Sequence, residues 1–245
     1  MNELVLVAGG TSGIGLDTAK YLSQKGYKVI ICGRRTIQSN NLILIKTDLR
    51  SDDSVVSLHN KLIKEYGHID SLVFCAGITK KNQTIEQFNE KEWDNIFNTN
   101  VKGFLRLIKI FYASLKESKG RVVVMNSMAA RSFSQFSSID YSASKGALSA
   151  IVRQLAIEWS KDKILINSLF PSMTLTPMLQ ENLTKKEIDE LSNMLPLDEL
   201  SNMLPLKRLA KTEDITRAVE FLINKNNKYI TGSGIDISGG QFLNG

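Results

Sequence analysis

Short apolar runs alternate along the chain with longer segments in which apolar residues recur every three or four positions. The short runs are nearly continuous in Val, Ile and Leu, which is typical of parallel strands that helices cover on both faces. They lie at residues 4–8, 29–32, 42–45, 72–74, 122–125, 164–169 and 235–237. The helical patterns lie at about 14–25, 52–66, 91–117, 140–160 and 212–223. This alternation predicts an α/β fold, a Rossmann-type doubly wound parallel sheet of about seven strands flanked by helices.

Length and composition suit one domain over residues 1–245, because a chain of 245 residues that is 42% hydrophobic can bury a large core. No apolar stretch approaches the roughly 18 residues that a membrane span needs. No basic segment followed by an apolar one precedes the first predicted strand, so the pattern of a secretory signal is missing. We therefore expect a cytoplasmic protein without a membrane partner.

The chain is basic, with a formal net charge of +6 and a pI of about 9.2. Its lysines are scattered, as in residues 224–228, and no basic run with interleaved aromatic residues occurs. We expect a solvated basic surface and no nucleic-acid partner, with nucleic-acid binding as a distant alternative. The two cysteines, Cys32 and Cys75, have no neighbours at metal-ligand spacing, so we expect buried thiols and no metal.

A glycine-rich turn follows the first predicted strand and opens the first predicted helix. Gly9, Gly13 and Gly15 permit a tight turn, a close backbone approach to a pyrophosphate, and close packing of helix on strand. The helix N-terminus would offer free N–H groups to the phosphates. The turn therefore predicts a dinucleotide site, whose contacts here are Gly9, Thr11, Ser12, Gly13 and Ile14.

The second predicted strand ends in Gly33, Arg34 and Arg35, where an NAD site usually has Asp or Glu. A guanidinium group pairs well with a 2′-phosphate. We therefore expect NADP(H) to be preferred over NAD(H), with Arg34 as the main contact. The alternative is that both arginines are solvated loop residues.

Tyr141 and Lys145 lie four residues apart in a predicted helix and so share one face. A free tyrosine has a pKa near 10, and a nearby ammonium group would favour the phenolate and lower that pKa. The pair could then exchange a proton with a substrate oxygen. Without further residues in register, Tyr141 could instead simply pack on the helix while Lys145 reaches solvent.

Further motifs are in register with these. They are Asp48-Leu49, Ala76-Gly77, Asn100, Ser127, and the segments 205–209, 213–215, 230–232 and 239–240. The whole set resembles the classical short-chain dehydrogenase/reductase family, in particular its 3-oxoacyl-[acyl-carrier-protein] reductases, over nearly the whole chain. Four positions depart from the family pattern: Ala8, Phe74, Cys75 and Ser172. Residues 35–46 are also too few for the full helix that the family commonly has there.

The resemblance implies the roles of the site residues. Tyr141 would act as the acid or base, Ser127 would bind the substrate oxygen, Lys145 would also bind the nicotinamide ribose, and Asn100 would support a water-linked proton path. The cofactor contacts implied beyond the glycine turn and Arg34 are Arg35, Asp48, Leu49, Ala76, Gly77, Asn100, Tyr141, Lys145, Pro171 and Thr174.

The resulting functional prediction is an NADP(H)-dependent oxidoreductase that interconverts a carbonyl and a secondary alcohol. Its candidate substrates are small-molecule carbonyls and 3-oxoacyl thioesters. The alternative is a catalytically silent nucleotide-binding regulatory protein of the same fold. The presence of Asn100, Ser127, Tyr141 and Lys145 together favours the enzyme.

Residues 172–207 would cover the substrate, by the same resemblance. This segment contains a perfect tandem repeat, in which the nonapeptide 189–197 recurs at 198–206. We expect the second copy to keep the docking typical of the family while the extra nine residues bulge outward. We also expect a homotetramer or homodimer formed through residues 91–117 and 140–160. The apolar residues that suggest it are Phe104, Leu107, Ile108, Phe111, Leu148, Ile151, Leu155 and Trp159, although burial within one chain could explain several of them.

Overall fold

The computed structural model describes residues 3–39, 41–80, 84–132, 137–174, 176–178 and 205–242. Most of the predicted substrate-covering segment, the whole first copy of the repeat and residues 198–204 of the second lie outside this description. At the described end of the second copy, Leu206 donates a backbone hydrogen bond to the Gly239 carbonyl, at 3.2 Å. Next to it, a Cβ added at Gly240 would lie 2.9 Å from Pro205.

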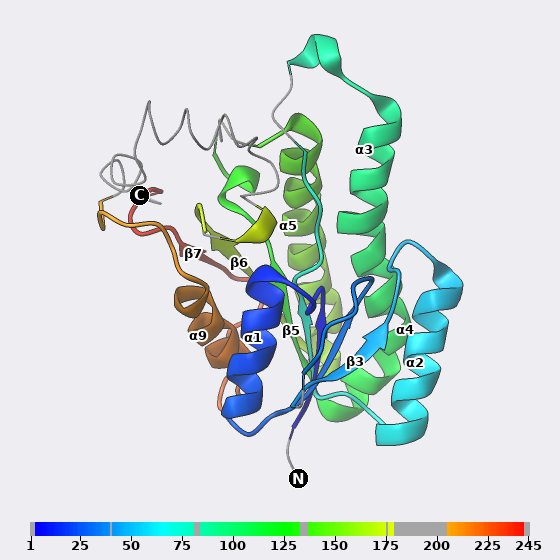
Figure 1. Cartoon of the computed structure of the whole chain (residues 1–245). Helices are drawn as coiled ribbons and strands as arrows, with labels where there is room; N and C mark the ends of the chain where they lie inside the picture. Colours follow the sequence, from blue (N-terminus) through cyan, green and yellow to red (C-terminus); the bar gives the residue numbers. More distant parts are fainter. Residues whose placement is uncertain are drawn as a thin grey trace.

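The core of the fold is a parallel sheet of seven strands in the order β3-β2-β1-β4-β5-β6-β7 (Figure 1). The strands are β1 (Leu4–Ala8), β2 (Lys28–Gly33), β3 (Ile43–Lys46), β4 (Ser71–Phe74), β5 (Arg121–Met125), β6 (Leu165–Pro171) and β7 (Gly234–Ile237). The order reverses between β1 and β4, which is the switch point where such sheets bind ligands. The predicted doubly wound fold is confirmed.

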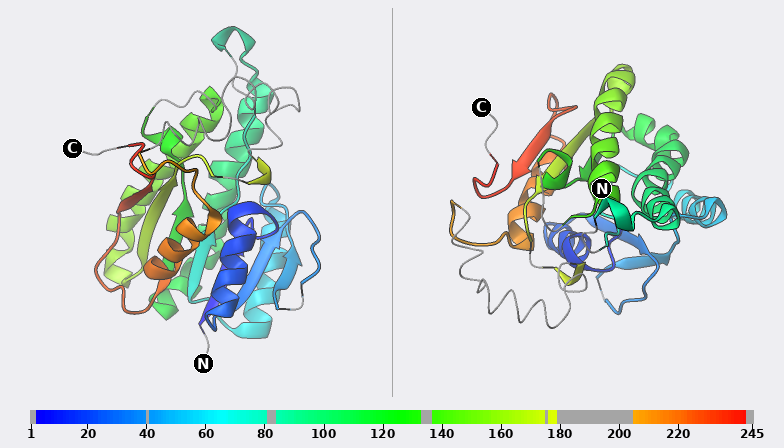
Figure 2. Two further views of the ribbon diagram at one scale, coloured as in Figure 1. Left: turned by 60° about the vertical axis from the view of Figure 1, so that its left-hand side comes forward. Right: turned by 90° about the horizontal axis from the view of Figure 1, so that it is seen from above.

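Helices cover both faces of the sheet because successive side chains of each strand point to opposite faces (Figure 2). On β1, Leu4 and Leu6 join one core cluster, and Val5 and Val7 join the other. The first face is covered by α2 (Asp52–Tyr66), α4 (Gly103–Ser118) and α5 (Ile139–Trp159). The second is covered by α1 (Gly13–Gln24) and α9 (Thr212–Ile223). This arrangement explains why the strands read as continuous apolar runs.

The helix predicted over residues 91–117 is interrupted. The structure has α3 (Glu90–Phe97), then a π-helical turn at Asn98–Lys102, then α4. A π turn holds an extra residue and is common at functional sites. Here the turn contains Asn100, which is fully buried.

Most of the apolar residues that suggested an oligomer belong to the core of the single chain. Six of the eight are buried there, namely Phe104, Leu107, Ile108, Phe111, Leu148 and Trp159. Ile151 and Leu155 are partly buried against the same cluster. These residues therefore carry little information about assembly, because intramolecular packing already accounts for them.

The connection between β2 and β3 forms no helix in its described residues, as its length predicted. Across the described part of the chain, no helix is long and apolar enough to cross a membrane.

Candidate active site

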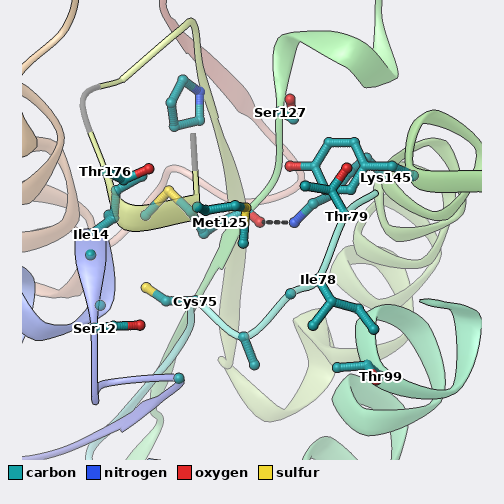
Figure 3. Close-up of a pocket in the computed structure, with 18 of the residues that line it drawn as sticks. Ser12, Ile14, Cys75, Ile78, Thr79, Thr99, Met125, Ser127, Lys145 and Thr176 are labelled. Carbon is teal, nitrogen blue, oxygen red and sulfur yellow. Dashed lines mark hydrogen bonds between the residues drawn. The ribbon is translucent and has the colours of Figure 1, made fainter. Parts of the chain in front are cut away.

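The carboxyl ends of β1, β2, β4, β5 and β6 open into one cavity of about 680 Å³. Figure 3 shows how residues from several elements converge on it. With one exception, every residue predicted for the site lines this cavity. These are Gly9, Thr11, Ser12, Gly13, Ile14, Arg34, Arg35, Asp48, Leu49, Ala76, Gly77, Ser127, Tyr141, Lys145, Pro171 and Thr174. The exception is Asn100, which is fully buried and does not line the cavity.

The glycine turn packs so closely on the chain after β4 that side chains are excluded. Gly9 has a φ of +80°, and a Cβ there would lie 2.5 Å from the Ala76 nitrogen. A Cβ at Gly15 would lie 2.3 Å from the Gly9 carbonyl oxygen. Only glycine therefore fits at positions 9 and 15. We call the turn over residues 9–15 the glycine cradle.

The N-terminus of α1 faces this cradle. Its N-cap, Ser12, makes no side-chain capping hydrogen bond, and the first turn contains no acidic residue. A helix start with these properties attracts an anion through its N–H groups and dipole. The residues present thus fit a dinucleotide pyrophosphate.

The departures at Ala8 and Cys75 remove side-chain polarity but leave a backbone link between the two strand ends. The Cys75 N–H donates to the Ala8 carbonyl at 2.8 Å. The Cys75 thiol lines the cavity, as Figure 3 shows. Burial raises the pKa of Cys75, and likewise that of Cys32, to about 12, so neither thiol ionises near neutral pH.

We call the part of the cavity lined by Arg34, Arg35, Asp48 and Arg50 the arginine end. Arg34 and Arg35 are exposed, whereas Asp48 is half-buried. Asp48 accepts several hydrogen bonds from Arg50, the shortest at 2.7 Å. These bonds lower the pKa of Asp48 to about 2, so it is ionised throughout the neutral range.

We call the part lined by Ser127, Tyr141 and Lys145 the tyrosine end. Lys145 is 4% exposed, and its Nζ donates to the Met125 carbonyl at 2.8 Å, drawn in Figure 3. The same Nζ lies 5.5 Å from the centroid of the Tyr141 ring. The shared helix face predicted for Tyr141 and Lys145 therefore does point into the cavity.

The electrostatics of this pair correct one expectation. Burial raises the pKa of Tyr141 above its ordinary value, and a hydrogen bond with Ser127 only partly opposes this. Burial also lowers the pKa of Lys145 to about 8. The expected lowering of the Tyr141 pKa by Lys145 is thus wrong for this state, because desolvation of the phenol is the dominant cause and outweighs the hydrogen bond with Ser127.

Asn126 fixes the backbone that carries Ser127. Its Oδ1 accepts the Ser127 N–H at 3.0 Å, its own N–H donates to the Leu169 carbonyl at 2.8 Å, and its Nδ2 donates to Ser149 Oγ at 2.9 Å. Ser149 Oγ in turn donates to the Lys145 carbonyl. The end of β5 is thereby tied to both β6 and α5.

Asn100 joins the π turn to the same helix. Its Oδ1 accepts the Ile78 N–H at 2.8 Å, and its Nδ2 donates to the Ile78 carbonyl and to Ser144 Oγ, both at 3.0 Å. Ser144 Oγ donates to the Tyr141 carbonyl at 2.7 Å. A Cβ at Gly77 would lie 3.6 Å from both Asn100 Oδ1 and Lys145 Nζ. Asn100 and Lys145 therefore lie on the same side of Gly77, although Asn100 does not line the cavity.

Several residues of this network were missed by the sequence analysis. Ser144 could have been found, because it lies three residues after Tyr141 in the same helix. Asn126 and Arg50 adjoin predicted residues but gave no signal of their own. Thr176 also lines the cavity, 3.6 Å from where a Gly13 Cβ would lie. Among the described residues, no cluster of His, Cys, Asp or Glu could hold a metal ion.

The comparison with family models decides the family. Residues 3–187 match the model of the short chain dehydrogenases. The chain belongs to the short-chain dehydrogenase/reductase family. The matching model and relatives are dehydrogenases and reductases, and this chain is accordingly an oxidoreductase that uses a nicotinamide cofactor to interconvert carbonyl and alcohol groups.

Relatives and solved structures of the family cover almost the entire chain. The chain is similar to a 3-oxoacyl-[acyl-carrier-protein] reductase of Staphylococcus epidermidis, with 27% identity over 99% of this chain and 100% of the relative. It is similar to the structure of ElxO with NADP bound, with 28% identity, a TM-score of 0.87, and 98% and 99% of the two chains covered. It is also similar to a 3-ketoacyl-(acyl-carrier-protein) reductase from Brucella melitensis complexed with NADH, with 25% identity, a TM-score of 0.86, and 98% of each chain covered. The structures similar to this chain thus include one with NADP bound and one with NADH bound.

Proposed function

We propose that this short-chain dehydrogenase/reductase is an NADP(H)-dependent carbonyl reductase in which Tyr141 donates the proton. The observation that carries the proposal is the meeting of Ser127, Tyr141 and Lys145 at one end of a cavity that also contains the glycine cradle. A dinucleotide held at the cradle would extend toward Tyr141 along the same cavity. When bound, its nicotinamide supplies the hydride.

The pKa directions suit the direction of reduction. A phenol with a raised pKa is protonated at neutral pH and can donate to an alkoxide that develops beside it. The Ser127 hydroxyl would donate a second hydrogen bond to that oxygen and stabilise its charge in a partly dry site. Lys145, with a pKa near 8, can exchange protons near neutral pH and return one to Tyr141. Asn100 would hold the helix that carries both.

The preference for NADP(H) follows from the charges at the arginine end. No acidic residue ends β2 to receive ribose hydroxyls, and Arg34 and Arg35 stand there instead. Guanidinium groups bind a phosphate monoester through paired, charge-assisted hydrogen bonds.

A 3-oxoacyl thioester is our candidate substrate class. The similarity to 3-oxoacyl reductases supports it. The cavity is also lined by Met128 and Met173, whose flexible side chains adapt to an irregular apolar ligand.

The test is the oxidation of NADPH and of NADH with acetoacetyl-CoA and with a panel of simple ketones. We expect turnover with NADPH and a much higher KM for NADH. Arg34→Glu should raise the KM for NADPH by about tenfold or more, since it replaces an attractive charge by a repulsive one. Lys20→Glu, an exposed change of the same charge on α1, is the control and should change neither KM.

Failure would take a clear form. Binding of NADPH without turnover of any carbonyl would favour the silent regulatory protein. A wild-type preference for NADH, or an Arg34→Glu variant with an unchanged KM for NADPH, would contradict the assigned cofactor preference.

A further inference from the structure

Asp48 is an acidic side chain at the end of the cavity where a phosphate is expected. Arg50 surrounds it: Arg50 Nε donates to Oδ1 at 3.0 Å and to Oδ2 at 3.2 Å, and a terminal nitrogen donates to Oδ2 at 2.7 Å. The backbone N–H of Arg50 donates to Oδ1 at 3.0 Å as well. Both carboxylate oxygens are therefore engaged by one residue.

The turn that carries the pair is fixed from outside. The Asp48 N–H donates to Ser54 Oγ at 2.9 Å. Arg106 donates to the Leu49 carbonyl at 3.3 Å and to Asp52 Oδ1 at 2.8 Å. The backbone of Asp48 is therefore held at the cavity on both sides, and the carboxylate is kept there by its hydrogen bonds with Arg50. The negative charge of Asp48 therefore has to be neutralised at the arginine end itself.

An unpaired Asp48 would act against phosphate binding in two ways. Its negative charge would repel the phosphate directly, because both would lie in the same cavity. It would also compete for Arg34, whose charge reaches Asp48 and helps to lower its pKa. Arg50 already pairs with the carboxylate and is the largest influence on it, so it weakens both effects.

We propose that Arg50 is a specificity-determining residue, which favours a 2′-phosphorylated nucleotide by neutralising Asp48 rather than by binding the phosphate itself. The proposal rests on the proposed preference for NADP(H). It assigns the selectivity of the arginine end to three residues acting together: Arg34 attracts the phosphate, Asp48 opposes it, and Arg50 cancels Asp48.

The test compares two small probes that differ at the 2′ position. Binding of 2′,5′-ADP and of 5′-AMP is measured by titration calorimetry at low ionic strength for the wild type, Arg50→Gln and the double variant Asp48→Asn/Arg50→Gln. The ratio of the two dissociation constants isolates the 2′-phosphate and needs neither substrate nor turnover. Arg153→Gln, an exposed change on α5, is the matched control. Thermal unfolding shows that each variant is folded.

We expect Arg50→Gln to reduce the preference for 2′,5′-ADP by roughly tenfold, the size typical of one uncompensated charge close to a ligand. The double variant should regain most of the wild-type ratio, because no carboxylate remains to be neutralised. Arg153→Gln should keep the wild-type ratio.

Three results would overturn the inference. An unchanged ratio in Arg50→Gln would show that Asp48 needs no partner. An equal loss in the single and double variants would show that Arg50 binds the phosphate directly. If the wild type itself binds 2′,5′-ADP no better than 5′-AMP, the preference for NADP(H) fails, and this inference fails with it. A wild-type preference that survives Arg50→Gln instead sinks the role of Arg50 alone.

Discussion

At the tyrosine end of the cavity, Lys145 is almost completely buried and bonded to a backbone carbonyl, whereas at the arginine end Arg34 and Arg35 are exposed. Burial at the first end shifts the pKa values of both Tyr141 and Lys145. At the second end the one large shift, that of Asp48, comes from direct pairing with Arg50. Desolvation therefore sets the pKa values of the ionisable groups at the tyrosine end, whereas ion pairing sets the pKa of Asp48 at the arginine end.

This difference indicates which kind of change should affect each end of the cavity. A buried group depends on its fixed neighbours, so the tyrosine end should respond to the loss of single hydrogen-bond partners. Exposed charges interact through solvent, so the arginine end should respond to net charge and ionic strength.

The largest effect is expected from Tyr141→Phe, which removes the proton donor and keeps the ring. We expect kcat to fall by about 10²- to 10⁴-fold, the usual contribution of a positioned acid. The affinity for NADPH should stay close to that of the wild type, because the arginine end is untouched. Steady-state kinetics and fluorescence titration measure the two quantities. A variant that keeps its turnover would remove Tyr141 from the mechanism.

Lys145→Met should reveal the cost of burying the ammonium group. Burial lowers the pKa of Lys145 from 10.5 to about 8, so the charged form destabilises the folded state by about 3 kcal/mol at pH 7. This cost is fully present below pH 8 and falls as the pH rises, disappearing above pH 10.5, where the amine becomes neutral in both states. We therefore expect the variant to be the more stable protein at pH 7, with the gap closing from pH 8 upward.

Urea unfolding of both proteins from pH 7 to 10 measures this gap. Comparing the two at each pH cancels the contribution of Cys32, which does not interact with Lys145, whereas Cys75 is coupled to Lys145 and belongs to the measured gap. A gap that does not change with pH would contradict the shift assigned to Lys145.

Ser144→Ala should have an intermediate effect. It removes the acceptor of Asn100 Nδ2 and the donor to the Tyr141 carbonyl. Leaving one N–H of the buried Asn100 amide unpaired costs about 1–3 kcal/mol of the free energy of unfolding, although its bonds with Ile78 remain. If Ser144 positions the pair, kcat should fall and the pH–rate profile should move while the affinity for NADPH stays constant. Ser142→Ala, two residues earlier in α5, is the control. A loss of stability with an unchanged pH–rate profile would make Ser144 a purely structural residue.

The smallest effect is expected from salt. Raising the ionic strength from 0.01 M to 0.15 M shortens the screening length from about 30 Å to about 8 Å. The affinity for NADPH should fall several-fold, and that for NADH less, because only the former carries the 2′-phosphate. Turnover of the saturated enzyme should change little. Equal salt effects on both cofactors would argue against an electrostatic origin of the preference.

The sequence predicted the fold well because each strand of a covered parallel sheet is marked by its own apolar run. All seven runs correspond to strands, and the alternation of runs and helices predicted the doubly wound parallel sheet, while the order of the strands came from the structure. The π turn at Asn98–Lys102 could not be predicted in this way, because apolar periodicity over residues 91–117 does not show one residue of local excess.

The sequence predicted those site residues whose spacing along the chain alone brings them together. Tyr141 and Lys145 share a helix face, and the glycines after β1 form the cradle. The partners of these residues were harder to find, since Asn126, Ser144 and Arg50 are recognised only once β5, α5 and the turn after β3 are placed in space. The direction of the Tyr141 pKa was wrong for a related reason, because burial of a side chain is a property of the folded chain.

The π turn has a consequence for how this chain can vary in length. Deleting one residue between positions 98 and 102 would restore a regular helix, but it would rotate everything that follows by about 100° relative to what precedes. Either the amide of Asn100 or the apolar flank of α4 with Phe104, Leu107 and Phe111 would then lose its place. The extra residue of the π turn therefore shifts the helical register, so that Asn100 can face the site while α4 keeps its apolar side against the core.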